Sequence, residues 1–152
     1  MFMKFLNSYF NDQASLEQLN QEFDSYSHYL RKHYKAFDEK TFQILYKGLI
    51  NDCTIEKLSF NTYWGDNEEH LADIQIILEY NEKRFLCCYK AVSYFSFPKE
   101  FYSEFGFDAI LISECLIFSD YFEHTLYFVG NIPLVIKCQR MYIENISNIS
   151  SF

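Results

Sequence analysis

The stretch YFEHTLYF, residues 121–128, places a carboxylate and an imidazole side by side in an otherwise aromatic and apolar run with one threonine. Glu123 and His124 are of the residue types that perform general acid–base catalysis, and histidine is also a common metal ligand. In a β-strand, however, successive side chains point to opposite faces, so these two cannot form a local pair. A histidine on an apolar strand face is usually a core imidazole held by one hydrogen bond. We therefore interpret Glu123 and His124 as architectural residues.

No other group of residues matches a known catalytic or metal-binding motif. The four histidines lie at 28, 33, 70 and 124 without an HExxH motif, and the five cysteines form no CxxC pair. Four scattered glycines build no phosphate-binding loop. The sequence therefore predicts no catalytic residue, no metal and no cofactor. One alternative stays open, a small hydrolase or ligand-binding β-domain in which Asp52 and His124 converge in a pocket with a cysteine or a glutamate.

The segment YWGDNEEH, residues 63–70, is a candidate for binding. It carries the only tryptophan, Trp64, followed by a Gly-Asp-Asn turn and by three carboxylates, Asp66, Glu68 and Glu69. Between two strands, such a loop presents an aromatic anchor beside negative charge, which suits a basic protein partner. The alternative is an ordinary acidic hairpin loop with Trp64 packed back on the sheet.

Composition and charge exclude several classes of protein. The chain has 152 residues, which predicts one domain, and 49% of them are hydrophobic. The net charge of −8 disfavours binding to nucleic acids and to anionic membranes, and suits solubility or a basic partner. The opening MFMKFLNSYFN has polar interruptions and does not read as a signal peptide. Unpaired cysteines then predict buried, reduced thiols and a cytoplasmic protein.

The N-terminal third has helical periodicity. Ser15 followed by Gln18 is a capping-box pattern that predicts a helix over roughly residues 16–36. Its apolar stripe comprises Leu16, Leu19, Phe23, Tyr26, Leu30, His33 or Tyr34, and Phe37. Asp38 is expected to cap a second, shorter helix, and Gly48 is expected to end it. That helix carries Phe42, Leu45 and Leu49.

After about residue 53 the apolar period changes to two, which is typical of strands. In LADIQIILEY, the residues Ala72, Ile74, Ile76, Leu78 and Tyr80 share one face. Turns are expected at Asn81-Glu82-Lys83, Pro98-Lys99-Glu100, Ser119-Asp120 and Gly130-Asn131. The prediction is an α+β fold with N-terminal helices packed on a six- to seven-strand antiparallel meander sheet. It forms a single domain over 1–152, with a helical part at 1–50 and an antiparallel β part at 51–146.

Several segments resemble a group of small, poorly characterised bacterial proteins. LINDCTIEKLSF (49–60) is similar to their "L-H-D-C/S-x-I-x-x-I" pattern, AVSYFSFPKE to their central strand, and residues 110–144 to their closing three strands with "FEH". Some members lie in toxin-immunity gene clusters, so the resemblance implies an immunity protein. Asn51 stands where the group has histidine, while Asp52 is kept, and we expect this pair to shape the corner between helices and sheet. Glu123 and His124 correspond to the Glu-His of the "FEH" pattern in this group, and we expect them to have a structural role only.

These observations favour a cytoplasmic, non-enzymatic binding protein, an immunity protein that blocks the active site of a cognate basic toxin. Two acidic surfaces are expected to bind the partner: Trp64, Asp66, Glu68 and Glu69 on one, and Glu17, Glu22 and Asp24 on the other. Neither nucleic acid nor a membrane is expected as a partner, and long aromatic edge strands leave room for a homodimer. A stand-alone structural domain without such a partner is the third hypothesis.

Overall fold

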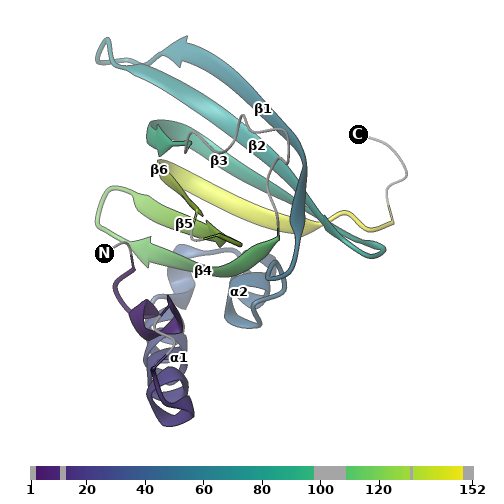
Figure 1. The fold of residues 1–152 in the computed structure, drawn as a ribbon. Coiled ribbons are helices and arrows are strands. Elements are labelled where there is room, and N and C mark those ends of the chain that lie inside the picture. Colours follow the sequence, from purple (N-terminus) through teal and green to yellow (C-terminus); the bar gives the residue numbers. More distant parts are fainter. Residues whose placement is uncertain (1–2, 11–12, 98–108, 131, 149–152) are drawn as a thin grey trace.

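The computed structural model describes residues 3–10, 13–97, 109–130 and 132–148. Within these ranges, helices come first and six β-strands follow, which confirms the predicted α+β class (Figure 1). The helices are η1 Asn7–Phe10, α1 Leu16–Lys32, η2 Tyr34–Ala36 and α2 Glu39–Tyr46. The strands are β1 Thr54–Trp64, β2 His70–Tyr80, β3 Lys83–Ser96, β4 Ile110–Ile117, β5 Phe122–Phe128 and β6 Ile132–Asn145. No helix in the described ranges is long and apolar enough to cross a bilayer.

Helix α1 begins at the predicted capping box and ends earlier than predicted. The Gln18 N–H donates to Ser15 Oγ at 3.1 Å, and the Ser15 N–H donates to Gln18 Oε1 at 3.2 Å. The helix ends at Lys32, and the cap residue His33 leaves the helical conformation, with φ of −108° and ψ of 18°. Its amide is shared between the carbonyl oxygens three and four residues back. Residues 34–36 form a separate 3-10 turn instead of continuing the helix.

Only the C-terminal half of the apolar stripe on α1 reaches the core. Tyr26, Leu30 and Phe37 are buried, whereas Leu16 is 73% exposed and Phe23 is 38% exposed. Figure 1 shows the reason, since α1 points away from the sheet and its first turns have no strand beside them. An apolar stripe of this kind is expected to be core along its whole length, and that expectation is wrong for Leu16 and Phe23.

Helix α2 begins at its predicted cap and completes the end of β6. The Asp38 carboxylate accepts the Thr41 N–H at 2.7 Å, which satisfies one of the unpaired amides at the helix start. The buried Thr41 hydroxyl accepts the Ile143 N–H at 2.9 Å and donates to the Ile143 carbonyl oxygen at 3.3 Å. Strand β5 pairs with β6 only as far as Cys138. Beyond that point, Thr41 of α2 supplies the hydrogen bonds to β6 that β5 is too short to make.

Gly48 ends α2 in a left-handed conformation, with φ of +63°. Its N–H donates to the Leu45 carbonyl and the Leu49 N–H donates to the Ile44 carbonyl, at 3.2 Å and 3.0 Å, which is a Schellman motif. We expect Gly48→Ala to lower the free energy of unfolding by about 1–2 kcal/mol, because a Cβ penalises this conformation. Gly48→Asn, which tolerates it better, is the control. Urea denaturation measures both, and equal stability of the alanine variant and the parent chain would contradict the motif's role.

The sheet consists of two three-strand meanders joined side by side. Its order is β1-β2-β3-β6-β5-β4, and every neighbouring pair is antiparallel. Tight hairpins at 81–82 and 118–121 match the predicted turns, and Gly130, with φ of +89°, lies in the β5–β6 turn. The predicted break at Pro98-Lys99-Glu100 lies outside the described residues. The last strand pairs with β3, in the middle of the sheet, and β4 lies at an edge.

One apolar core joins the helices to the inner face of the sheet. Ala72, Ile74, Ile76 and Leu78 belong to it, as the alternation predicts, whereas Tyr80 at the strand end is 47% exposed. The helical contributions are Tyr26, Leu30, Phe37, Ile44, Leu45 and Ile50. A smaller cluster of Ile77, Leu86, Cys88 and Ile146 lies on the outer face. The sheet therefore buries apolar side chains on both faces, which explains the nearly continuous apolar runs in β2 and β3.

The β4 edge of the sheet is covered by hydrogen bonds from the N-terminal part of the chain. The Cys115 N–H donates to the Tyr26 hydroxyl at 2.7 Å, and the Ile117 N–H donates to the Tyr29 hydroxyl at 2.8 Å. Ile110 exchanges two backbone hydrogen bonds of 2.8 Å with the turn that precedes β1. Since unpaired edge amides invite the addition of foreign strands, these contacts close this edge.

A buried carboxylate on β4 holds the N-terminal segment in place. Glu114 is 2% exposed, and its side chain accepts three backbone N–H groups. Lys4 donates to Oε1 at 2.7 Å, while Phe5 and Leu6 donate to Oε2 at 2.9 Å and 3.1 Å. Hydrogen bonds to an ionised acceptor are stronger than neutral ones, so this contact is a main attachment of the segment.

Candidate functional site

The β1–β2 hairpin carries the binding candidate of the sequence at its tip. The Gly65 N–H donates to the Glu69 carbonyl at 2.7 Å, and the Glu68 N–H donates to the Gly65 carbonyl at 3.1 Å. Glu68 has φ of +63°. Counted between the hydrogen-bonded residues Gly65 and Glu69, this is a three-residue loop with a left-handed third residue, one of the standard hairpin connections. The turn is therefore built from the backbone, which leaves the loop side chains available for contacts.

Trp64 stands at the end of β1 with most of its surface open. Its side chain is 72% exposed, and its ring stacks on that of His70 at a centroid distance of 4.9 Å and an interplanar angle of 24°. Trp64 and His70 are direct cross-strand partners, which places the two rings on the same face of the sheet. Stacking on one side holds the indole in place and leaves its other side to solvent.

The three carboxylates of the tip do not point in the same direction. Asp66 and Glu68 are exposed, whereas Glu69 is half-buried. The Glu69 carboxylate folds over Gly65, where a Cβ added to the glycine would lie 2.7 Å from it. Its Oε2 atom is buried without a hydrogen-bond partner in the described part of the chain. Asp66 and Glu68 are therefore the residues of the tip that can meet a partner directly.

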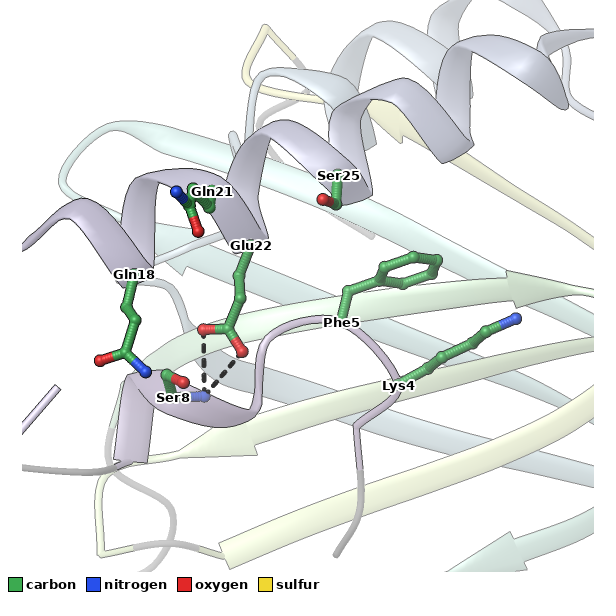
Figure 2. A pocket seen from close by; sticks show the side chains of 7 residues that line it. All are labelled: Lys4, Phe5, Ser8, Gln18, Gln21, Glu22 and Ser25. Carbon is green, nitrogen blue, oxygen red and sulfur yellow. Dashed lines mark hydrogen bonds between the residues drawn. The ribbon is translucent and has the colours of Figure 1, made fainter. Parts of the chain in front are cut away.

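The second predicted acidic surface, on α1, lies at the other end of the molecule from the hairpin tip (Figure 1). Glu17 and Asp24 are exposed. Glu22 instead accepts the Ser8 N–H with both carboxylate oxygens, each at 3.1 Å, and so fastens η1 to α1 (Figure 2). It lines a polar hollow of about 370 Å³ together with Lys4, whose Nζ lies 5.4 Å from the Phe5 ring centroid. The structure thus separates the predicted acidic residues into two distant groups.

His124 lies in the core and not on a surface. It is fully buried between β4 and β6, with Nδ1 2.8 Å from the Tyr89 hydroxyl. Its Nε2 has no partner among the described residues, and burial lowers the pKa of the imidazole from 6.5 to about 4. Glu123, on the opposite strand face, is half-buried and lies across from Lys137 of β6. The two residues point apart, as the alternation predicts.

Three buried thiols lie in the same core as this histidine. Cys115 is its cross-strand partner, and Cys87 and Cys138 are also buried in the same core cluster. Burial raises the pKa of all three thiols, that of Cys138 to about 12, so they are neutral and unreactive at neutral pH. Across the described residues, no group of three histidine, cysteine or acidic side chains is placed to hold a metal ion.

Asn51 and Asp52 lie in the turn between α2 and β1. Asp52 has φ of +72° and is exposed, and its N–H donates to the Ile110 carbonyl at 2.8 Å. The Asn51 N–H donates to the Gly48 carbonyl at 3.1 Å, and its Oδ1 is buried without a partner in the described chain. His124 has no exposed surface, so Asp52 and His124 cannot meet one substrate. The hydrolase alternative requires their convergence and finds no support in this geometry.

Sequence reasoning missed a group of three aromatic side chains, two of them exposed, that joins β1 to the end of β3. Phe60, Phe95 and Phe97 contact one another with ring centroids 5.1–5.5 Å apart, and Phe60 and Phe95 are 47% and 42% exposed. A hollow of about 340 Å³, lined in part by Thr62, His70 and Phe95, lies next to them. The signal was the period-two spacing of residues 58, 60, 62 and 64, which identifies one strand face but not its exposure.

Comparisons with models of known protein families, with curated protein sequences and with solved structures find no match to this chain.

Proposed function

We propose that this protein is a non-enzymatic binding protein, an immunity protein that neutralises a basic bacterial toxin by blocking its active site. The observation that carries the proposal is the hairpin tip, where the exposed Trp64 stands beside Asp66 and Glu68. Residues 63–70 contain three carboxylates and no lysine or arginine. An aromatic anchor rimmed by one sign of charge is the composition of a protein-binding hot spot. The resemblance to proteins of toxin-immunity clusters supplies the biological direction.

The blockade is steric and electrostatic. A toxin that cleaves a nucleic acid has a basic active site, and two exposed carboxylates attract it and accelerate association. Trp64 then supplies apolar contact area at low entropic cost, because the stacked His70 ring already restricts the indole. The acidic residues of α1 lie at the opposite end of the molecule, so we assign the contact to the tip and not to α1.

The double variant Asp66→Lys/Glu68→Lys should bind the toxin more slowly. We expect the association rate at low salt to fall by about tenfold or more, with a flatter dependence on salt, because long-range attraction is lost. The matched control is Glu17→Lys/Asp24→Lys, which changes the charge equally at the far end of the molecule. Surface plasmon resonance across a series of salt concentrations measures both. A larger effect of the α1 variant would place the contact on α1. Equal effects would mean that association depends only on the net charge of the protein and not on the hairpin tip.

The function itself is tested by capture followed by neutralisation. The tagged chain is used to capture proteins from a lysate of its native host, with low-salt and then high-salt washes. A captured basic protein is then expressed alone and together with this chain. Growth arrest by that protein, relieved by the parent chain and not by the double variant, is the expected result. A folded, monomeric bait that captures nothing, or captures only non-toxic proteins, would contradict the immunity function.

A further inference from the structure

The free edge of β1 presents a regular set of unpaired backbone groups. In an antiparallel pair, hydrogen-bonded and non-bonded residue pairs alternate along the strands. The bond from Gly65 to Glu69 closes the hairpin, so Trp64 and His70 form a non-bonded pair, and the alternation continues down β1. The residues whose N–H and C=O groups point away from β2 are therefore Leu58, Phe60, Thr62 and Trp64. No partner for these groups exists in the described chain.

Among the described residues, this edge has none of the features that normally prevent strand addition. Proteins protect a free edge with proline, charged side chains, bulges or covering segments. Residues 58–64, LSFNTYW, contain no proline and no charge, and the bulge in β1 lies below them, between Ile55 and Lys57. On the opposite edge, β4 is closed by Tyr26, Tyr29 and the turn before β1. The contrast marks the β1 edge as the interaction edge of the sheet.

We propose that the β1 edge binds an extended segment of a protein partner as a seventh strand of the sheet. The added strand runs antiparallel to β1, carries lysine or arginine at its N-terminal end, and has apolar side chains at alternate positions. The inference rests on the proposed function, since it names the way in which the toxin is held. Main-chain hydrogen bonds supply affinity in such complexes, and alternate side chains supply specificity.

The chemistry of the partner follows from the side chains along the edge. Phe60 and Trp64 lie on the same strand face and are 47% and 72% exposed, so alternate residues of an added strand pack against aromatic rings. Strand β1 runs towards the acidic tip. An antiparallel strand therefore begins at the tip, where Asp66 and Glu68 favour cationic residues at its N-terminal end.

A second copy of this chain is a poorer occupant than a basic partner. Each copy carries a net charge of −8, so two copies repel each other. Antiparallel pairing of two β1 strands about Asn61 also places Asp66 of one copy opposite Glu56 of the other. A basic segment meets neither obstacle.

Hydrogen exchange on the parent chain tests the proposal with a defined probe. The probe is a synthetic peptide of alternating valine and threonine with two lysines at its N-terminus, used at millimolar concentration. We expect it to slow exchange of the amides of Leu58, Phe60, Thr62 and Trp64 by about tenfold or more. The amides of residues 59, 61 and 63 already bond to β2 and should not change. Uniform or absent protection overturns the proposal.

Two control peptides separate backbone pairing from side-chain attraction. The first is N-methylated at alternate residues on its pairing edge, which keeps the side chains and removes the donors, and it should give no protection. The second carries both lysines at its C-terminus, and should bind about fivefold more weakly because they lie far from the tip. Protection by the N-methylated peptide, or equal binding of the two lysine arrangements, contradicts the antiparallel ladder.

Thr62→Pro tests the same edge from the side of the protein. Proline removes an N–H that points away from β2, so the fold tolerates it at an edge position, whereas Thr62→Val keeps the amide as a matched control. We expect Thr62→Pro to abolish the protection by the peptide and to weaken the binding of a captured toxin by at least about tenfold. Thr62→Val should change neither the protection nor the binding. If a toxin that this chain neutralises binds both variants equally, the proposal of a seventh strand is overturned, whereas the proposed function still stands. If the parent chain forms a dimer and Thr62→Pro is monomeric, the β1 edge binds a second copy of this chain instead, and the proposal is overturned.

Discussion

Glu114→Gln should destabilise the protein by about 2–4 kcal/mol and release the N-terminal segment, because three backbone amides then face one neutral side chain. In the native chain both carboxylate oxygens are used, one by Lys4 and the other by Phe5 and Leu6. A glutamine presents one acceptor and one donor. Whichever way its amide turns, an N–H group of the segment meets another N–H group at a side chain that is only 2% exposed.

The measurement combines urea denaturation with hydrogen exchange of the amides of residues 4–6. We expect exchange of these amides to accelerate more than that of the central strands, since local release precedes global unfolding. Glu123→Gln is the matched control, because Glu123 lies on the neighbouring strand, is half-buried and should tolerate the change within about 0.5 kcal/mol. Glu114→Gln with native stability and native protection of residues 4–6 would show that the carboxylate is not what attaches the segment.

The same contact bears on how the sheet meets its partners. The N-terminal segment is bound to Glu114 of β4, and the hydroxyls of Tyr26 and Tyr29 on α1 accept hydrogen bonds from the outward amides of Cys115 and Ile117. If α1 is released together with the segment, the outward amides of Cys115 and Ile117 lose their partners, and the chain acquires a second open edge and a tendency to associate through it. Glu114→Gln is therefore expected to associate more readily at high concentration than the control, and light scattering can follow this.

The parts of the fold that could be predicted from the sequence are those with local causes. The caps at Ser15 and Asp38 and the stop at Gly48 each depend on residues within a few positions of one another. The alternation in β2 likewise identified the buried face from neighbouring residues. The early end of α1 at Lys32 and the exposure of Leu16 depend on where the sheet lies, which no local pattern contains.

Strand order and the buried polar contacts could not be predicted for the same reason. Strand β6 pairs with β3, which lies more than forty positions earlier in the chain for most of its length. Glu114 is a lone carboxylate in the apolar run ILISECLI, and its partners are backbone amides near the N-terminus. Because every residue except proline has such an amide, the sequence does not identify these partners. Tyr89 and His124 likewise meet only because their strands both flank β6.

The candidate site could be predicted in composition but not in arrangement. Trp64 and the acidic residues after it were recognisable from residue type alone. That Glu69 turns back over Gly65, and that Glu22 is bound to the Ser8 amide, depends on side-chain conformation. The open edge of β1 was also hidden, because a strand at the edge and a strand in the middle of a sheet have the same alternation.

His124 should make the protein lose stability as the pH falls from about 6.5 to about 4. The folded state holds the imidazole with a pKa of about 4, against 6.5 when unfolded, so the unfolded chain binds the proton first. Stability from this group is therefore fully present above pH ~6.5 and is lost progressively down to pH ~4. A difference of about 2.5 pKa units corresponds to ~3 kcal/mol.

The cause does not depend on which ring nitrogen carries the proton. If Tyr89 donates to Nδ1, the proton sits on Nε2, which has no acceptor in the described residues. If Nδ1 donates to Tyr89, then Nε2 is bare and must take up the second proton in the same apolar setting. Either way, the charged form places an N–H and a full charge in the core without a partner, which is what burial penalises.

His124→Gln isolates this contribution, because glutamine keeps an acceptor for the Tyr89 hydroxyl and does not titrate. Urea denaturation of both chains from pH 7 to pH 4 gives two stability curves. Carboxylates titrate in both chains, so their effect cancels in the difference. We expect the parent chain to lose ~3 kcal/mol more than the variant over this interval, whatever the offset between the two at pH 7. Parallel curves, or an NMR titration of His124 in the folded protein with a midpoint near 6.5, would mean that water reaches the imidazole and that the core around Tyr89 is open.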